Sequence, residues 1–578
     1  MKKYLFLAVV LLGLASCAKE DIANGNNPIH NGEIEESYIA INLSASENTR
    51  ADGGVYVEGA AAERAVKTAH FFFFKDGAPF PVNVTNNTVT SPGGTINHLS
   101  ATLSGNTSGM NNVSDIKDVV LLLSSYKGEY PNQIVAVLNW NPEPTKAYYL
   151  SELETAVNIA TKYEGADYFV MSNAVYAAGD KVMDATPLTE DNIKTSETDA
   201  MAAPVKIYVE RVAAKVTVTT ADGKDLINLN KPLEDAYVLV GAPVTKDVYA
   251  KLLGWELYND NTQSYLLKQI DPSWDNTVTS AGFNWNDPAW YRSYWATSLD
   301  RPTGDDNSFQ MEYVTVPAGF ATEYGYAIGN NNKVGTADET AKSFTYIGEN
   351  TNGKDKGTKV ILKAQLVDEG GNALEIASWY GNKYIGEESL RTAVANTLKY
   401  TLYYHDVENS KYVGIMPEDL QCVAGGTADA PAGVDANEVY FQLSTAGQAK
   451  DWYKFVNGEY RNVADDIAND AKSVTATNAY LKSIQPGILY KNGETFYYVD
   501  IKHLGAEGSL AEYGVVRNHI YNIVINSIGG YGSPIYIGTS NLVTPGYPDT
   551  PDAEETFVSA QINILSWRLV SQEVDIQK

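Results

Sequence analysis

The chain has 578 residues, 43 of them basic and 71 acidic, and a formal net charge of −28; this length predicts about two to four domains, each with a sizeable core. The acidic balance excludes a nucleic-acid-binding protein, which needs a basic face for the phosphates. Two cysteines, Cys17 and Cys422, rule out a disulfide framework, and six scattered histidines without an HExxH or CxxC spacing argue against a zinc or redox enzyme.

The first residues read as an export signal. Lys2 and Lys3 precede an apolar run over residues 4–14, which is too short to span a bilayer. The run ends in Leu-Ala-Ser-Cys, which resembles a bacterial lipobox, so we expect cleavage before Cys17 and lipidation of its thiol. A plain secretory signal with an incidental cysteine is the alternative. No later apolar stretch reaches about 18 residues, so the lipid would be the membrane anchor.

A short strand is expected next, over residues 38–44. Ile39, Ile41 and Leu43 alternate with smaller or polar residues, which is typical of a half-buried strand. The following segment, 46–54, is polar and contains glycines, with Arg50 in its middle. Exposed loop tips of this kind are accessible to proteases.

The rest of the chain reads mostly as short strands between turns. Residues 69–75 contain four consecutive phenylalanines and are apolar on both faces. Many short strands with few helices favour β-sandwiches, and the polar segment 186–203 is expected to link two domains. Two helices are predicted from apolar spacing, over 150–162 and 387–398. Further strands are predicted over 119–124, 133–139, 206–209, 214–219, 236–240, 360–366, 439–443, 497–501 and 519–525.

The C-terminus carries an apolar strand behind a linker. Residues 529–552 are rich in Gly, Pro, Tyr and Thr and should be extended. An apolar strand follows, and its apolar phase switches near residues 564–565, which predicts a bulge there. Its own domain or another subunit must receive such a strand. Its apolar residues are Val558, Ile562, Ile564, Leu565, Trp567 and Leu569.

Few residues suggest chemistry. Arg517 and His519 are flanked by strand-like sequence and are expected to make structural hydrogen bonds at a strand start. Cys422 is expected to be a buried free thiol or simply a small residue. An aromatic cluster could stack on sugars, although packing over a sandwich end is the favoured interpretation. No P-loop, EF-hand or nucleophile elbow is present, so we expect no catalysis, no cofactor and no metal. The cluster comprises Phe283, Trp285, Trp290, Tyr291, Tyr294 and Trp295.

Several ordered segments resemble the fimbrillin family of Bacteroidota, the subunits of type V pili, and are most similar to the major subunit of short fimbriae. The lipobox at Cys17 is the first. The others are 209–216 (VERVAAKV), 290–296 (WYRSYWA), 346–351 (YIGENT), 514–521 (GVVRNHIY) and the tail 557–576.

The resemblance implies an all-β protein with two transthyretin-like β-sandwich domains and a few short helices. It implies export as an outer-membrane lipoprotein and cleavage by an arginine-specific protease after the first strand, which falls at Arg50-Ala51 here, with Arg64 as the alternative. The chain then divides into a signal peptide, a propeptide with the first strand, two sandwiches, and a linker with a donor strand. Their bounds are 1–17, 18–50, 51–203, 204–540 and 541–578.

Physical reasoning supports this assembly route. Loss of an edge strand carrying Ile39, Ile41 and Leu43 would expose a groove that another chain's strand can fill by β-augmentation. The C-terminal strand is the expected donor, and such head-to-tail contacts propagate a fibre. The expected partners are further copies of the chain, pilus anchor and tip subunits, and the protease. A tip or accessory adhesin and a surface glycan-binding lipoprotein are the alternatives.

Overall fold

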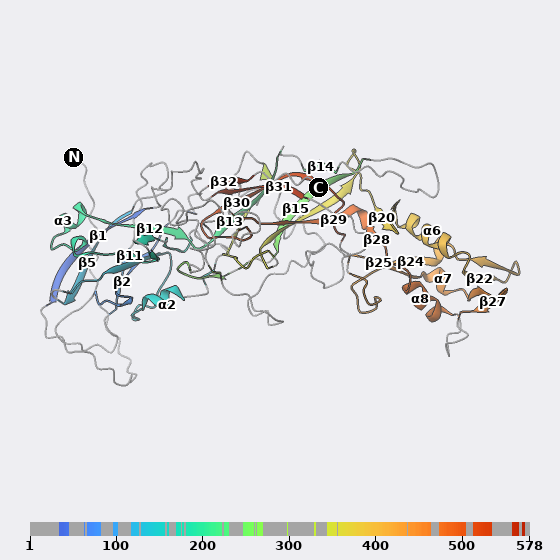
Figure 1. The fold of residues 1–578 in the computed structure, drawn as a ribbon, viewed down its shortest axis with the longest axis horizontal. Coiled ribbons are helices and arrows are strands. Elements are labelled where there is room, and N and C mark those ends of the chain that lie inside the picture. The colour runs from blue at the N-terminus through green and yellow to red at the C-terminus, as the bar shows by residue number, and fades with distance from the viewer. Residues whose placement is uncertain are drawn as a thin grey trace, which may run out of the picture.

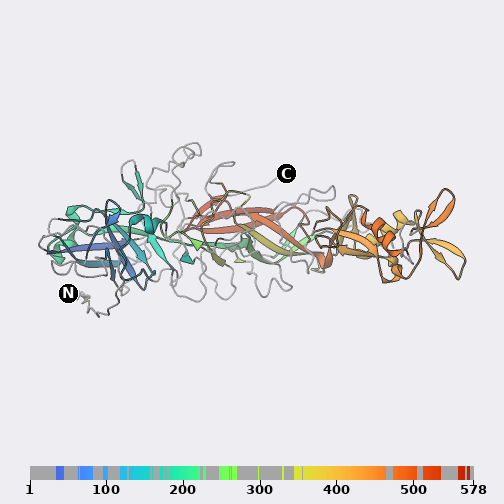
Figure 2. The same ribbon diagram turned by 90° about the horizontal axis from the view of Figure 1, so that it is seen from below.

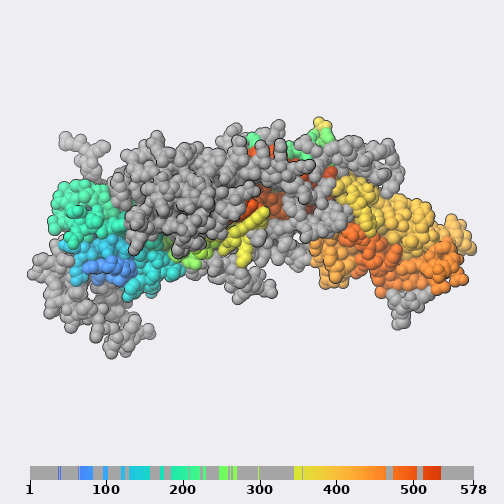
Figure 3. Space-filling view, in the orientation of Figure 1, coloured from blue at the N-terminus to red at the C-terminus, as the bar shows by residue number. Residues whose placement is uncertain are grey.

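The computed structural model is long and narrow, and strands dominate it (Figure 1). A large sheet lies at one end, a sandwich in the middle and a mixed lobe at the other end, as the perpendicular view also shows (Figure 2). In the space-filling view the coloured parts follow the same order, from the blue N-terminal part to the orange lobe (Figure 3). The predicted all-β class is confirmed. The structure describes residues 34–44, 63, 66–82, 96–101, 117–126, 129–155, 159–160, 169–174, 176–178, 181–221, 225–229, 247–258, 261, 263–269, 297–298, 329–330, 344–354, 356–435, 437–463, 473–503, 512–534, 558–565 and 569–572.

The first sheet contains the most N-terminal described strand, β1. In the described residues the strand order is β3-β2-β6-β8-β12-β1-β5, with β4 on β2 and β11 on β6. The bounds are β1 Ile34–Ser44, β2 Ala69–Lys75, β3 Ala78–Pro79, β4 His98–Ala101, β5 Lys117–Tyr126, β6 Gln133–Leu138, β8 Met171–Asn173, β11 Thr186–Pro187 and β12 Val205–Arg211.

Both faces of β2 are buried, as its four phenylalanines predict. Phe71 and Phe73 pack into one hydrophobic cluster, together with Ile39 of β1. Phe72 and Phe74 pack into a second cluster on the opposite face, which includes Leu153. Because strand residues alternate between faces, a run of identical large side chains requires such a doubly covered strand.

The middle of the molecule is a β-sandwich around the largest core. One sheet runs β17-β13-β30-β31-β32, with β18 on β13, and the other runs β14-β15-β19-β29. Val218 and Ile523 from the first meet Trp255 and Leu362 from the second. The bounds are β13 Ala214–Thr220, β14 Leu226–Asn228, β15 Tyr249–Tyr258, β17 Gly329–Asn330, β18 Phe344–Ile347, β19 Lys359–Val367, β29 Glu494–Asp500, β30 Ile520–Ile528, β31 Val558–Leu565 and β32 Leu569–Gln572.

The lobe at the far end is inserted between the paired strands β19 and β29 and has its own core. Trp452 and Phe441 lie at its centre, against the apolar face of α6. Its elements are β20 Ile376–Trp379, β21 Asn382–Ile385, α6 Glu387–Leu398, β22 Leu402–Asp406, β23 Lys411–Gly414, β24 Leu420–Ala424, β25 Val439–Leu443, α7 Thr445–Gln448, β26 Trp452–Val456, β27 Glu459–Asn462, α8 Val474–Lys482 and β28 Ile488–Tyr490, with 3-10 turns at Pro417–Asp419 and Lys491–Gly493.

One of the two predicted helices is confirmed and the other is too long. Helix α6 has the predicted bounds and buries Leu390, Val394 and Leu398 on one side. The helix predicted over 150–162 is instead α2, Leu150–Glu154. It stops early because β7, Ile159–Ala160, pairs with β16, Gln263–Ser264. Strand pairing with a distant segment overrides the local helical spacing there.

The segment 186–203 is ordered rather than an open linker. It contains β11, a 3-10 turn over Glu190–Asn192 and helix α3, Glu197–Ala202. The segment is polar in composition, but its few apolar residues pack on the first sheet: Leu188 and Ala200 are buried. The predicted strands appear within a few residues of their expected bounds, except the strand over 236–240, which lies outside the described residues. A two-stranded ribbon of β9, Tyr176–Ala178, and β10, Lys181–Met183, completes the described strands.

Candidate functional site

Strand β1 occupies a slot inside the first sheet. It pairs parallel with β12 and antiparallel with β5, so it is not the edge strand that the sequence predicts. In the described sheet, β5 is the edge strand on this side. Removing β1 would therefore leave unpaired backbone N–H and C=O groups on two strands at once. This costs more free energy than exposing the single edge of a sheet.

The slot is apolar on its core side. Ile39 is buried and lies opposite Leu121 of β5, and Ser37 lies opposite Leu123. The side chains of Ile41 and Leu43 lie outside the described residues, but their backbone register places them beside the buried Val205 and Ile207, respectively. Helix α3 also packs against β1 and β5.

The C-terminal strand pairs with its own sandwich. β31 lies antiparallel to β30, which itself runs parallel to β13. β32 then pairs back on β31, with Leu565 opposite Leu569. The predicted phase switch after Ile564 is therefore a reversal of the chain. A register shift does occur, but on β30 between Ile525 and Ser527.

Slot and C-terminal hairpin lie in different parts of the molecule. β1 is at the end of the long axis, whereas β31 and β32 lie in the middle sandwich (Figure 1). The site residues Val558, Ile562 and Ile564 are on β31, and their side chains lie outside the described residues. A strand that ends a sheet in one domain, and a slot in another domain, are the two surfaces that a head-to-tail contact requires.

A buried polar junction joins the first sheet to the middle sandwich. Glu63 is 1% exposed, and its carboxylate lies 2.9 Å from Lys215 Nζ and accepts a 2.6 Å hydrogen bond from the Tyr346 hydroxyl. Arg211 Nε donates to the Glu63 carbonyl at 2.6 Å and its guanidinium also donates to Asn518. Sequence reasoning missed this role of Glu63, because nothing in an Ala-Glu-Arg-Ala run indicates burial.

Arg517 is the second part of this junction and is fully buried. Its Nε donates to Glu349 Oε2 at 2.8 Å, and its guanidinium also donates to the carbonyls of Leu266 and Tyr265. His519 Nδ1 donates a hydrogen bond to the Arg517 carbonyl, at 2.8 Å. Strand β30 begins one residue later, so both residues are structural at a strand start, as predicted.

Three of the segments that carry the family resemblance meet at this junction. Residues 209–216 contribute Arg211 and Lys215, residues 346–351 contribute Tyr346 and Glu349, and residues 514–521 contribute Arg517 and Asn518. A buried ion pair requires good geometry and further hydrogen bonds, since both charges lose water. These sequence motifs are therefore the packing determinants of the junction.

Replacing Arg517 with Ala is expected to lower the free energy of unfolding by about 3–5 kcal/mol, because Glu349 would remain buried without its partner. Urea unfolding followed by tryptophan fluorescence measures this change. Arg461→Ala is the matched control: its pair with Glu459 is largely exposed, so less than about 1 kcal/mol should be lost. Equal effects of the two substitutions would contradict the assignment.

The described residues show no group of His, Cys, Asp or Glu side chains that could hold a metal ion. Cys422 is a half-buried free thiol, and burial raises its pKa well above the usual range, so it is a poor nucleophile. No helix among the described residues combines the length and apolarity that crossing a membrane requires.

Several predicted site residues lie outside the described residues. These are the lipidation site Cys17, the cleavage positions Arg50 and Ala51 with the alternative Arg64, the apolar Trp567, and the aromatic cluster Phe283, Trp285, Trp290, Tyr291, Tyr294 and Trp295.

Comparison with solved structures finds fimbrial and adhesion proteins at low similarity. A candidate cell adhesion protein from Parabacteroides distasonis is 11% identical, with 91% of this chain and 96% of that chain covered and a TM-score of 0.35. A fimbrilin from Porphyromonas gingivalis is 11% identical over 91% and 96%, with a TM-score of 0.33. The tip fimbrial protein Mfa3 from the same organism is 13% identical over 91% and 99%, with a TM-score of 0.25. No curated protein sequence matches.

A family comparison is more specific. Residues 488–573 match the family described as major fimbrial subunit protein type IV, fimbrillin, C-terminal. The match begins at β28 and runs through β29, β30, β31 and β32, so it includes the Arg517 junction and the C-terminal hairpin. The C-terminal part of the chain is therefore similar to the fimbrillin C-terminal region, which confirms the resemblance that the sequence motifs indicated.

Proposed function

We propose that the chain is a structural subunit of a surface fimbria, which polymerises head to tail by protease-triggered donor-strand exchange and supports adhesion. The observation that carries the proposal is the position of β1 between β12 and β5, upstream of Arg50 in the chain. Cleavage after Arg50 separates the whole of β1 from the rest of the chain. The fimbrillin-like C-terminal region provides the donor hairpin.

The proposed route begins with a lipid on Cys17, which holds the precursor at the outer membrane until the protease cuts between Arg50 and Ala51. The lipid and the strand carrying Ile39, Ile41 and Leu43 then leave together. The vacated slot of the first sheet accepts the C-terminal strand of the next subunit. Catalysis, a cofactor and a metal have no part in this role.

Strand exchange needs a favourable balance of contacts. If the six apolar side chains of the donor segment bury fully, the gross gain is about 9–18 kcal/mol. Ordering the linker and losing translational freedom consume much of it. The donor must also give up its pairing with β30, so exchange proceeds only when an empty slot offers pairing on both sides.

The test of the proposal is the N-terminus and intact mass of the protein recovered from the cell surface. A start at Ala51 without lipid supports a polymerising subunit. A lipidated start at Cys17 would contradict it and favour an anchor subunit or a surface lipoprotein.

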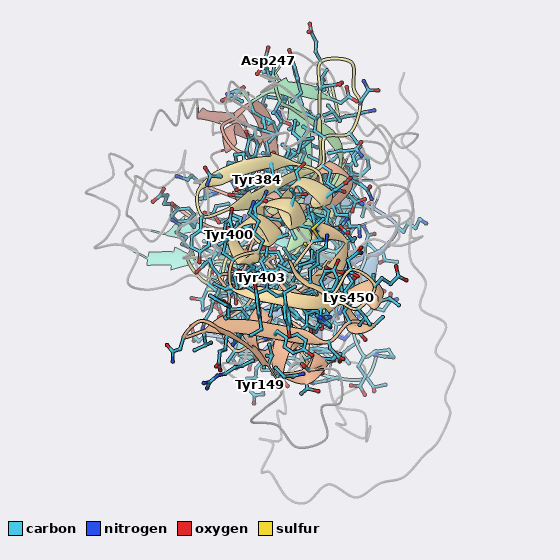
Figure 4. All side chains as sticks on the ribbon, turned by 90° about the vertical axis from the view of Figure 1, so that its right-hand side faces the viewer. Tyr149, Asp247, Tyr384, Tyr400, Tyr403 and Lys450 are labelled. Atoms are coloured by element: carbon cyan, nitrogen blue, oxygen red, sulfur yellow. The ribbon has the colours of Figure 1, made fainter. Side chains whose placement is uncertain are left out.

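A tip or accessory adhesin, or a glycan-binding protein, is the second candidate, and the far lobe favours it. The outward face of the sheet β23-β22-β26-β27 carries no charged side chain. Tyr412 and Tyr460 stack with centroids 3.8 Å apart, and Phe455 is 48% exposed. The lobe faces the viewer in Figure 4, where Tyr403 is labelled. Its rings are Tyr403, His405, Tyr412, Tyr453, Phe455 and Tyr460.

If this face binds neutral oligosaccharides, Tyr460→Ala should weaken binding at least about tenfold, which is about 1.4 kcal/mol. Binding of the full chain to immobilised neutral oligosaccharides measures the effect. Tyr400→Ala is the control, because Tyr400 is 72% exposed in the same lobe but lies outside this sheet. An absence of saturable binding, or equal loss with both variants, would discard the candidate.

A further inference from the structure

Glu63 ties the segment between β1 and β2 to the rest of the molecule. Between residues 44 and 66 the structure describes Glu63 alone. Its contacts come from three elements: Arg211 at the end of β12, Lys215 on β13 and Tyr346 on β18. Tyr346 also packs edge-on against Phe169, which belongs to the hydrophobic core of the first sheet, with ring centroids 4.6 Å apart. Glu63 therefore lies where both parts of the molecule meet.

The contacts of Glu63 hold it in its ionised form. Burial by itself raises the pKa of the Glu63 carboxyl, but the charge of Lys215 and the hydrogen bonds from Tyr346 and Lys215 outweigh burial, so the pKa is lowered overall. Lys215 is itself 0% exposed. If Glu63 left the junction, the Lys215 ammonium would stay buried without the carboxylate that pairs with it, which is strongly unfavourable.

This anchoring bears on the choice between two arginines. Arg64 directly follows Glu63 in the chain. A protease binds several residues around the bond it cuts, so in a folded substrate it cuts the locally opened form. The Glu63 carbonyl and the Glu63 carboxylate both accept hydrogen bonds. Local unfolding that would admit the protease at Arg64 therefore requires that the contacts with Arg211, Lys215 and Tyr346 are lost together.

We propose that Glu63 is the specificity-determining residue of maturation: its burial at the junction withholds the bond after Arg64, so that cleavage falls after Arg50. The inference rests on the proposed function, because it concerns the same processing step. It also assigns Glu63 a role after maturation, in which it keeps the new N-terminal segment fixed at the junction once β1 has left.

The experiment digests the full chain with a purified arginine-specific endoprotease and follows the new N-termini by mass spectrometry over time. The wild-type chain should yield the Ala51 start long before any Ala65 start. Glu63→Gln should raise the rate of cleavage after Arg64 at least about tenfold, since it removes the charge that pairs with the buried Lys215 and weakens the hydrogen bonds to the side chain. Tyr346→Phe removes one hydroxyl and should raise this rate severalfold.

Glu512→Gln is the matched control. It disrupts the Lys502–Glu512 pair of the middle sandwich, where the Glu512 side chain is 6% exposed, without touching Glu63. Cleavage after Arg64 should stay at the wild-type rate in this variant. The rate of cleavage after Arg50 is the internal reference, and it should be the same in all four chains.

Three outcomes would overturn the inference: equal cleavage after Arg50 and Arg64 in the wild-type chain, no acceleration in a folded Glu63→Gln chain, or the same acceleration at both arginines. If Glu63→Gln does not fold, an unchanged rate in Tyr346→Phe overturns it. Failure of the proposed function looks different. There, the wild-type chain is not cut after Arg50, or the cut chain stays monomeric, while cleavage after Arg64 is still measured.

Discussion

Deleting residues 556–578 is expected to leave folded monomers that no longer form fibres. The deletion removes β31 and β32, and with them the proposed donor residues from Val558 to Leu569. The fold is expected to survive, because the core of the middle sandwich includes Val218 on β13 and Ile523 on β30, which the deletion leaves in place. Loss of polymerisation should be complete, because the deletion removes every residue of the proposed donor.

Size-exclusion chromatography and negative-stain electron microscopy of the protease-treated chain measure this result. Deletion of 574–578, beyond the end of β32, is the matched control and should still polymerise. Circular dichroism should show that both truncated chains are folded and rich in strands. Fibres from the 556–578 deletion would refute the donor role of the C-terminal hairpin.

The substitution Arg50→Ala is expected to abolish protease-triggered assembly. The chain should keep β1 in its slot between β12 and β5, and the incoming strand would find no unpaired backbone. A protease pocket built for a guanidinium rejects alanine strongly, so cleavage at this position should slow by at least about 100-fold.

Polymer yield after treatment with an arginine-specific protease measures the effect, with Arg64→Ala as the control that should polymerise normally. Polymers from Arg50→Ala would show that β1 need not leave or that another bond is the trigger. A monomeric Arg64→Ala chain would move the processing site to Arg64 and contradict the Arg50 assignment.

The position of β1 changes how maturation is understood physically. An edge strand can dissociate after it loses pairing on one side, whereas β1 is paired on both sides and packs against α3. Cleavage alone therefore leaves β1 held by its backbone pairs. We expect β1 to leave slowly for this reason, so that its release limits the rate at which the strand of the next subunit enters the vacated slot.

The junction explains why the motif segments are separated in sequence yet belong together. Arg211, Glu349 and Arg517 come from three distant parts of the chain and are all buried within one network. A buried charge without its partner is costly in free energy, so replacing one of these residues destabilises the protein by leaving its partner's charge buried and uncompensated. The resemblance found in short segments thus reflects a single structural unit.

The sequence by itself determined the features that depend on neighbouring residues. Alternation of apolar side chains identified β1, and the run of phenylalanines predicted that both faces of β2 are covered. Apolar spacing with acids in the first turn gave α6 its bounds. In each case the signal is the periodicity of a local backbone conformation, which a single segment carries.

Only the tertiary structure decided the features that depend on distant partners. β1 lies inside the sheet because β5 and β12 pair with it from either side. α2 is short because β16 pairs with the residues that follow it. The C-terminal segment folds back as β32 and pairs with β31. The burial of Glu63 belongs to the same class. Its partners Lys215 and Tyr346 are far away in sequence, and the free energy of a buried charge depends on the partners that surround it, which local sequence does not encode.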